Sequence, residues 1–133
     1  MAFTEAVHNA EWNGRSLAIR PNWLRDVVGR NCKSLQCDVA FTVWLVGHEL
    51  GHYAHGHLYE GADRQRHYAE EQLADFIGGQ ALAICDADLG SVLNALEDLC
   101  PNPTDTHPGF WVRQQAVNRG YNAAIRAGFG RAG

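Results

Sequence analysis

The sequence lacks the features expected of a membrane protein, a nucleic-acid-binding protein or an exported protein. No run of about 18 apolar residues is present, as a spanning helix requires, and the most apolar stretch, residues 41–47, is far too short. Eleven basic residues stand against fifteen acidic ones, which argues against nucleic-acid binding. The first residues contain no apolar segment typical of a secretory signal. We therefore expect one soluble, cytoplasmic domain over residues 1–133.

Cysteine is also scarce, with four in the chain and none spaced as CxxC. This spacing excludes a thiolate zinc ribbon, and the count is too low for a disulfide framework. Cys32 and Cys37 flank an expected turn and could form a disulfide if the protein were exported, but we expect reduced, structural cysteines. Cys85 and Cys100 stand in apolar sequence, where a free thiol behaves as a small hydrophobic residue.

The N-terminal part of the chain predicts two short strands and a short helix. The strands are expected at Asn9–Trp12 and Ser16–Arg20, on either side of the turn Asn13–Arg15, because an Asn-Gly pair between β-rich segments is typical of a hairpin. The helix is expected at Trp23–Val28, ended by Gly29, and a polar connection follows over residues 31–36.

The rest of the chain predicts longer helices. Val39–His55, capped by Asp38, is apolar on nearly all sides, which indicates a helix buried in the middle of a domain. Further helices are expected at Arg64–Ile84, at Leu89–Leu99 after a cap at Asp86 or Asp88, and from Thr106-His107-Pro108 to about Ala127, with a flexible tail over 128–133. The expected fold class is α+β, mostly α: short N-terminal strands, then about four helices packed around the buried one.

The buried helix carries the segment His48-Glu49-Leu50-Gly51-His52. Residues four apart lie on one helix face, so both imidazoles can reach one ion. Glu49 can reach a water on that ion but not readily the ion itself, which is the HExxH zinc signature. Two histidines and a carboxylate on an apolar helix are costly to bury unless something pairs with them. We therefore predict one Zn²⁺ at this helix.

A catalytic zinc needs a third protein ligand, and Glu71 on the next predicted helix is the best candidate. Asp75 lies four residues on and on the same face, where it can accept the second ring N–H of a zinc histidine. Glu70 competes for the ligand role, but it points about 100° away around the helix. His55 and His57 are expected to be exposed or to support the site from outside.

Small residues favour a close approach of these two helices. Gly78-Gly79 would lie in the interior of the second helix, and Gly47 and Gly51 provide a matching surface on the first. Each glycine costs about 1 kcal/mol relative to alanine in a helix, which is usually offset where two backbones approach closely. The alternative is a kink or an early helix end at Gly78. The four tryptophans are expected in the core or in a cleft wall.

Together these residues resemble the gluzincin metallopeptidases, specifically the family of the CaaX prenyl endopeptidase and the HtpX protease. That family has HExxH, then ExxAD, then His-Pro with an arginine six residues after the histidine. The corresponding residues here are His48–His52, Glu71–Asp75, His107-Pro108 and Arg113. An Asn-Ala pair in an edge strand also belongs to the pattern, and Asn9-Ala10 is in the matching place. Those relatives are mostly membrane-embedded, so this chain resembles a soluble minimal version, similar also to the ImmA/IrrE-type regulatory proteases.

The resemblance implies a zincin-like fold and a role for each matching residue. His48, His52 and Glu71 would be the zinc ligands, with Glu49 as the general base. His107 would be catalytic, as an oxyanion donor, while Asp75 and Arg113 would support the ligands. Asn9 and Ala10 would bind a peptide or protein substrate along the edge strand.

The function expected from these assignments is zinc-dependent hydrolysis of peptide bonds. The alternatives are a latent peptidase and a non-enzymatic zinc-binding regulatory module that retains the site. An unligated Glu49 beside the ion argues against a purely structural site, which four protein ligands usually close.

Overall fold

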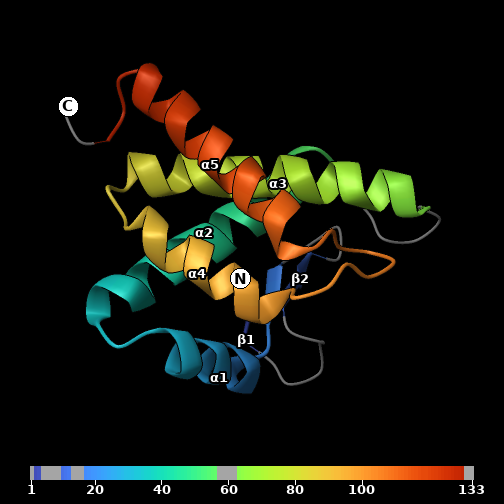
Figure 1. The fold of residues 1–133 in the computed structure, drawn as a ribbon, viewed down its shortest axis with the longest axis horizontal. Coiled ribbons are helices and arrows are strands. Elements are labelled where there is room, and N and C mark those ends of the chain that lie inside the picture. The colour runs from blue at the N-terminus through green and yellow to red at the C-terminus, as the bar shows by residue number, and fades with distance from the viewer. Residues whose placement is uncertain (1, 4–9, 13–16, 57–62, 131–133) are drawn as a thin grey trace.

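The computed structural model describes residues 2–3, 10–12, 17–56 and 63–130. Within these ranges the chain forms three short strands followed by five helices (Figure 1). The strands are β1 (Ala2–Phe3), β2 (Ala10–Trp12) and β3 (Leu17–Ile19), and the helices are α1 (Pro21–Asn31), α2 (Leu35–Ala54), α3 (Arg64–Ile84), α4 (Leu89–Leu99) and α5 (Phe110–Arg126). The mostly helical fold that the sequence predicts is confirmed.

The three strands form one small sheet in the order β1-β3-β2. β2 pairs with β3 in antiparallel register, with Ala10 opposite Ile19 and Trp12 opposite Leu17, as expected for a hairpin. The predicted turn Asn13–Arg15 lies outside the described residues. β1 pairs in parallel with β3, and this strand was not predicted, because two residues are too short for a periodic pattern. β2 is therefore at an edge of the described sheet.

The helix that carries His48 and His52 begins earlier than predicted. Ser34 is the N-cap of α2, and its hydroxyl accepts a hydrogen bond from the backbone N–H of Cys37 at 3.2 Å. Asp38 lies inside the first turn instead, where its negative charge favours the positive end of the helix dipole. Farther along, Phe41, Trp44 and Leu45 are buried in the core. The predicted central position of this helix is confirmed.

The bounds of α3 and α4 agree with the prediction because side-chain caps mark both starts. Asp63 accepts a hydrogen bond from the backbone N–H of Arg66 at 2.8 Å. Asp88, one of the two residues predicted as the N-cap of α4, accepts hydrogen bonds from the backbone N–H and the hydroxyl of Ser91. Asp86, the other candidate, adopts a left-handed conformation with φ 50° between the two helices.

Two further helices differ from the predicted bounds. α1 begins at Pro21, two residues before the predicted start, because proline suits the first turn of a helix. It continues through Gly29, which we expected to end it, to Asn31. α5 begins at Phe110, after Gly109 as N-cap, and not at residues 106–108. There the chain turns on itself, since Thr104 donates its N–H to the carbonyl of His107 at 2.9 Å.

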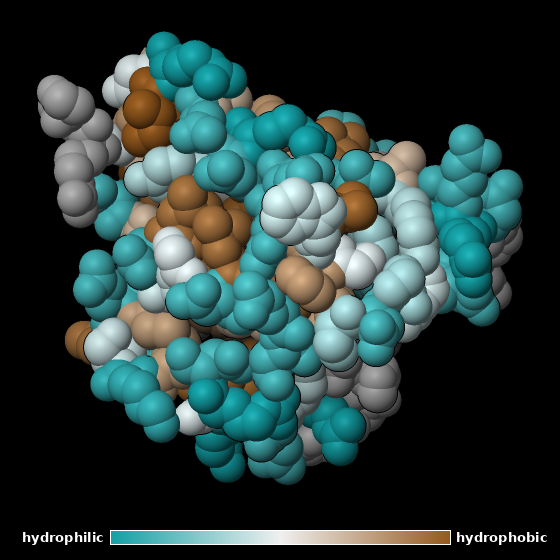
Figure 2. Space-filling view, viewed as in Figure 1, coloured by the Kyte–Doolittle hydropathy of each residue, from teal (hydrophilic) through white to brown (hydrophobic). Residues whose placement is uncertain are grey.

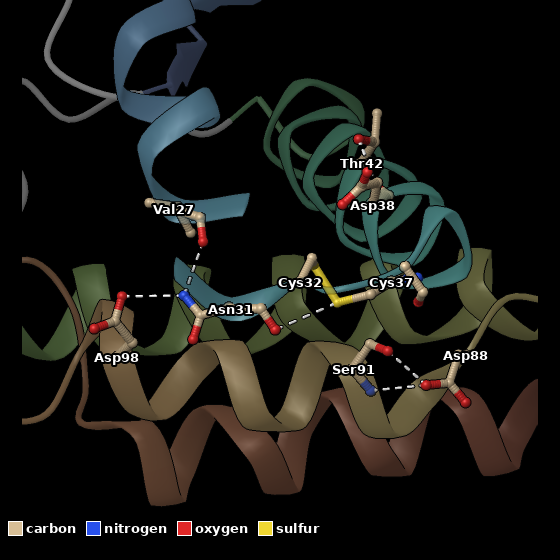
Figure 3. Close-up of a disulfide and its surroundings, with 10 residues drawn as sticks. Val27, Asn31, Cys32, Cys37, Asp38, Thr42, Asp88, Ser91 and Asp98 are labelled. Carbon is tan, nitrogen blue, oxygen red and sulfur yellow. Dashed lines mark hydrogen bonds between the residues drawn. A yellow bond between two sulfur atoms is a disulfide. The ribbon is translucent and has the colours of Figure 1, made fainter. Parts of the chain in front are cut away.

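Figure 3 shows a disulfide between Cys32 and Cys37, which corrects the expectation that these cysteines are reduced. The end of α1 and the capped start of α2 bring the two Cα atoms to 5.2 Å, within the usual span of a disulfide. Disulfides persist mainly in oxidising compartments, so this pair does not support the cytoplasmic location, which stays a prediction. Cys100 is buried as expected, whereas Cys85 is exposed.

The helices pack tightly around a core formed mainly by α2, α3, α4 and α5. α3 and α5 cross at the top of Figure 1, with α2 and α4 beneath them and α1 at the opposite end. Their crossing depends on Gly79 and Gly120, because an added Cβ on either would overlap a carbonyl oxygen of the other helix. α2 and α3 meet through Gly47, Gly51 and Gly78. The predicted close approach is confirmed, except that Gly79 faces α5 and not α2.

The end of α5 and the surface complete the described structure. Gly128, with φ 95°, follows the helix, and Phe129 donates its N–H to the carbonyl oxygen of Ala124 at 3.0 Å. This closing turn is typical of a helix C-terminus.

The face of the molecule in Figure 2 is largely hydrophilic, with separate hydrophobic patches. Among the described residues, no helix combines the length and the apolar character needed to cross a membrane.

Candidate metal centre

Two buried histidines of α2 face one another across one helical turn. The Nε2 atoms of His48 and His52 are 3.2 Å apart, and their rings meet edge to face. Both side chains are almost entirely buried, at 3% and 4% exposure. The pair that the sequence places on one helix face therefore converges on one point inside the protein.

Glu71 of α3 completes this group. Its Oε2 is 3.1 Å from Nε2 of His48, and its Oε1 is 3.1 Å from Nε2 of His52. The neighbouring Glu70 accepts a hydrogen bond from Arg66 instead. Of the two candidate carboxylates, Glu71 is thus the one that reaches the histidines, as predicted.

The three side chains fit a metal ion. His48, His52 and Glu71 offer ligand atoms within 4.8 Å of one another, and all three residues are buried. Ligand atoms about 2.1 Å from a tetrahedral zinc are about 3.4 Å apart, and the contacts here are 3.1–3.2 Å, with each carboxylate oxygen of Glu71 beside a different histidine. The group could therefore bind a metal with little movement of its side chains.

Asp75 and Arg113 fix the orientation of His48 from behind. Asp75 is fully buried, and its Oδ1 accepts a hydrogen bond from Nδ1 of His48 at 2.8 Å. Arg113 of α5 donates to the same carboxylate through Nε at 2.8 Å and Nη2 at 3.0 Å. Because the carboxylate is an acceptor, Nδ1 of His48 carries a proton in this contact, and Nε2 is the ring atom that faces Glu71.

Glu49 is buried beside the group without belonging to it. Its nearest carboxylate oxygen is 3.8 Å from Nε2 of His48, farther than either oxygen of Glu71 is from its histidine. Burial raises the pKa of Glu49, although the neighbouring histidines oppose the shift. A carboxyl group with a raised pKa next to a ligand set is the environment expected of a general base.

The charges of the site act strongly on one another. Burial would lower the pKa of His48, but the carboxylates of Glu71 and Asp75 outweigh it and raise that pKa to about 10. Burial would likewise raise the pKa of Glu71, yet His48 and a hydrogen bond from His107 hold it well below its usual value. The buried carboxylates thus favour positive charge at the point where the three ligand atoms meet.

His107 approaches the group from the loop before α5. Its Nε2 is 3.2 Å from Oε1 of Glu71, its Nδ1 is 2.8 Å from the hydroxyl of Thr106, and about a third of the side chain is exposed. Its place at the rim suits contact with a molecule arriving from solvent. The structure therefore brings His107 and Arg113 to the site, as the resemblance implies.

The remaining predicted residues lie elsewhere or outside the description. Asn9 and His57 lie outside the described residues, and Ala10 begins the edge strand β2. His55 is exposed at the end of α2, and its Nδ1 is 3.0 Å from the carbonyl oxygen of Gly51. The expected exposure of His55 is therefore confirmed.

Two residues at the site were not assigned to it from the sequence. Trp44 packs against the ring of His48, and Cys100 accepts a hydrogen bond from Nη1 of Arg113 at 3.4 Å. The position of Trp44, four residues before His48, could have indicated the contact, because it places both on one helix face. No sequence signal connects Cys100 to Arg113, which are joined only by the packing of α4 on α5.

Comparison of the chain with protein-family models, with curated proteins and with solved structures returned no match.

Proposed function

We propose that this chain is a zinc-dependent metallopeptidase of the gluzincin type. The observation that carries the proposal is the convergence of His48, His52 and Glu71 at 3.1–3.2 Å, with the buried Glu49 beside them but outside the ligand set. Two histidines and one glutamate are the donor set of a catalytic zinc site that keeps a position for water. A structural site would have no use for the extra carboxylate.

The charge of the buried group favours a divalent ion. When ionised, Glu49, Glu71 and Asp75 bring three negative charges, and Arg113 returns one positive charge. A histidine must be neutral to bind a metal, and with His48 and His52 in that form the group keeps a surplus of two negative charges in a region where burial makes uncompensated charge costly. A divalent cation would neutralise that surplus, and imidazole together with carboxylate suits zinc.

The chain's own residues supply the remaining parts of peptide hydrolysis. A zinc ion at this position would act as a Lewis acid and lower the pKa of a bound water toward about 7. Glu49 accepts the proton from the attacking water and passes it to the leaving amine. His107, at the rim, donates a hydrogen bond from Nε2 to the developing oxyanion. Asp75 and Arg113 orient His48 so that its Nε2, and not its Nδ1, would bind the ion.

The experiment is a peptide-library cleavage assay on the unmodified chain and on Glu49→Gln, with zinc measured in both. We expect cleavage by the unmodified chain and a loss of at least about a hundredfold in the variant, with zinc content unchanged. Glu70→Gln is the matched control, because this neighbouring carboxylate binds Arg66 and not the site. Full activity of Glu49→Gln would contradict the mechanism.

A latent or non-enzymatic zinc module is the second candidate, and the position of His107 favours it. With Nε2 at 3.2 Å from Glu71, this histidine is close enough to become a fourth ligand after a small movement of its loop. His107→Ala separates the two functions. A peptidase should keep its zinc and lose activity in this variant, whereas a site closed by His107 should bind zinc more weakly.

A further inference from the structure

Trp44 contacts both residues that are hydrogen-bonded to Asp75, namely His48 and Arg113. Its ring centroid is 5.3 Å from that of His48, with the two planes tilted by 43°. Cζ of Arg113 is 5.6 Å from the centroid of the same indole, within the range of a cation–π interaction. Asp75 joins the imidazole to the guanidinium. One buried aromatic side chain therefore contacts both partners of this carboxylate.

Core packing alone does not explain a tryptophan at this position. The indole is 2% exposed, and its Nε1–H has no hydrogen-bond partner among the described residues, an arrangement that is costly for a buried donor. The indole also requires glycine at position 78, where a Cβ would lie 2.7 Å from its Cδ1. A phenylalanine would remove the unpaired N–H and ease the contact with α3. What phenylalanine lacks is the length to cover imidazole and guanidinium together.

We infer that Trp44 is a positioning residue of the metal centre. It holds the imidazole of His48 and the guanidinium of Arg113 against the Asp75 carboxylate, so that Nε2 of His48 faces Glu71 and His52. The inference deepens the proposed function, on which it rests.

The test compares Trp44→Phe with the unmodified chain in zinc affinity, measured by competition with a chelator, and in the absorption spectrum of the Co²⁺-substituted protein. We expect zinc affinity to fall about tenfold, as for other residues that orient a metal ligand, and the Co²⁺ bands to shift. The metal-free variant should also unfold at a lower temperature, because the smaller ring leaves a cavity in the core. Trp23→Phe is the control: this ring packs on Phe41 in the core, so its loss should change stability and leave zinc affinity and the Co²⁺ spectrum alone.

Other outcomes would overturn the role of Trp44. Zinc affinity and Co²⁺ bands equal to those of the unmodified chain would show that the indole only fills space. If Trp44→Phe does not fold, 5-fluorotryptophan in the otherwise native chain replaces it, with the Trp44 resonance assigned by elimination from variants of the other tryptophans. Zinc should then shift the ¹⁹F signal of Trp44 and not that of Trp23; an unmoved Trp44 signal contradicts the inference. Failure of the unmodified chain to bind zinc would instead refute the proposed function itself.

Discussion

Replacing Gly120 by alanine tests whether the crossing of α3 and α5 sets the geometry of the site. The added Cβ would overlap the carbonyl oxygen of Phe76 and lie 2.7 Å from its carbonyl carbon. Ordinary carbon contacts are about 3.5–4.0 Å, so the helices must separate by about 1 Å. Overpacking costs about 1–3 kcal/mol, and the upper end applies because a backbone carbonyl cannot rotate away. Alanine returns about 1 kcal/mol of helix propensity, which leaves a net loss of about 2 kcal/mol.

The assay is thermal and urea unfolding of Gly120→Ala beside Gly29→Ala. Gly29 lies inside α1 with nothing within 4 Å of its would-be Cβ, so alanine there should stabilise the protein by up to about 1 kcal/mol. For Gly120→Ala we expect Tm to fall by roughly 6–10 °C. Zinc affinity should fall as well, since α5 carries Arg113 to Asp75. A Gly120→Ala variant as stable as Gly29→Ala would refute the close crossing of these helices.

Two further predictions concern charge. Asp75→Asn leaves Arg113 buried without its carboxylate partner, and a broken buried pair costs about 3–5 kcal/mol. Urea unfolding in the presence of a chelator should show this loss in the free energy of unfolding. A loss under about 1 kcal/mol would contradict the assigned role. At the surface, the hydrogen bond from Arg30 lowers the pKa of Asp98. The contribution of this pair to the stability of the fold should therefore be complete above the ordinary pKa of an aspartate, about 4, and should disappear as the pH falls through the lowered pKa. Asp98→Asn should therefore lose at most about 1 kcal/mol at pH 7, and this deficit should shrink as the pH falls below about 4. A deficit that does not change with pH would contradict the pairing.

The parts of the fold that the sequence predicts well are those with local signals. α3 and α4 have the predicted bounds because an aspartate caps the start of each. The two histidines of α2 share a face because a helix repeats every 3.6 residues. Glu71 could be preferred over Glu70 for the same reason, since Asp75 lies on its face. These features depend on the spacing of residues along one or two helices, and this spacing can be read directly from the sequence.

The parts that were missed depend on contacts between distant segments. The loop that delays α5 is held by two backbone hydrogen bonds, from the N–H of Thr104 to the carbonyl of His107 and from the N–H of Phe110 to the carbonyl of Cys100. The disulfide forms because the capped start of α2 returns next to the end of α1 (Figure 3). Trp44 reaches Arg113 only once α5 crosses the core. None of these contacts has a period or a cap that could be seen before the chain is folded.

The most direct test of the metal centre is the zinc content of purified Glu71→Gln and Glu70→Gln, measured by elemental mass spectrometry. The unmodified chain is measured in the same way for comparison. The two variants remove the same charge from adjacent residues, but only Glu71 faces both histidines. The account predicts about one zinc per chain for the unmodified protein and Glu70→Gln, and a small fraction of that for Glu71→Gln. Equal zinc in both variants, or none in the unmodified chain, would contradict it.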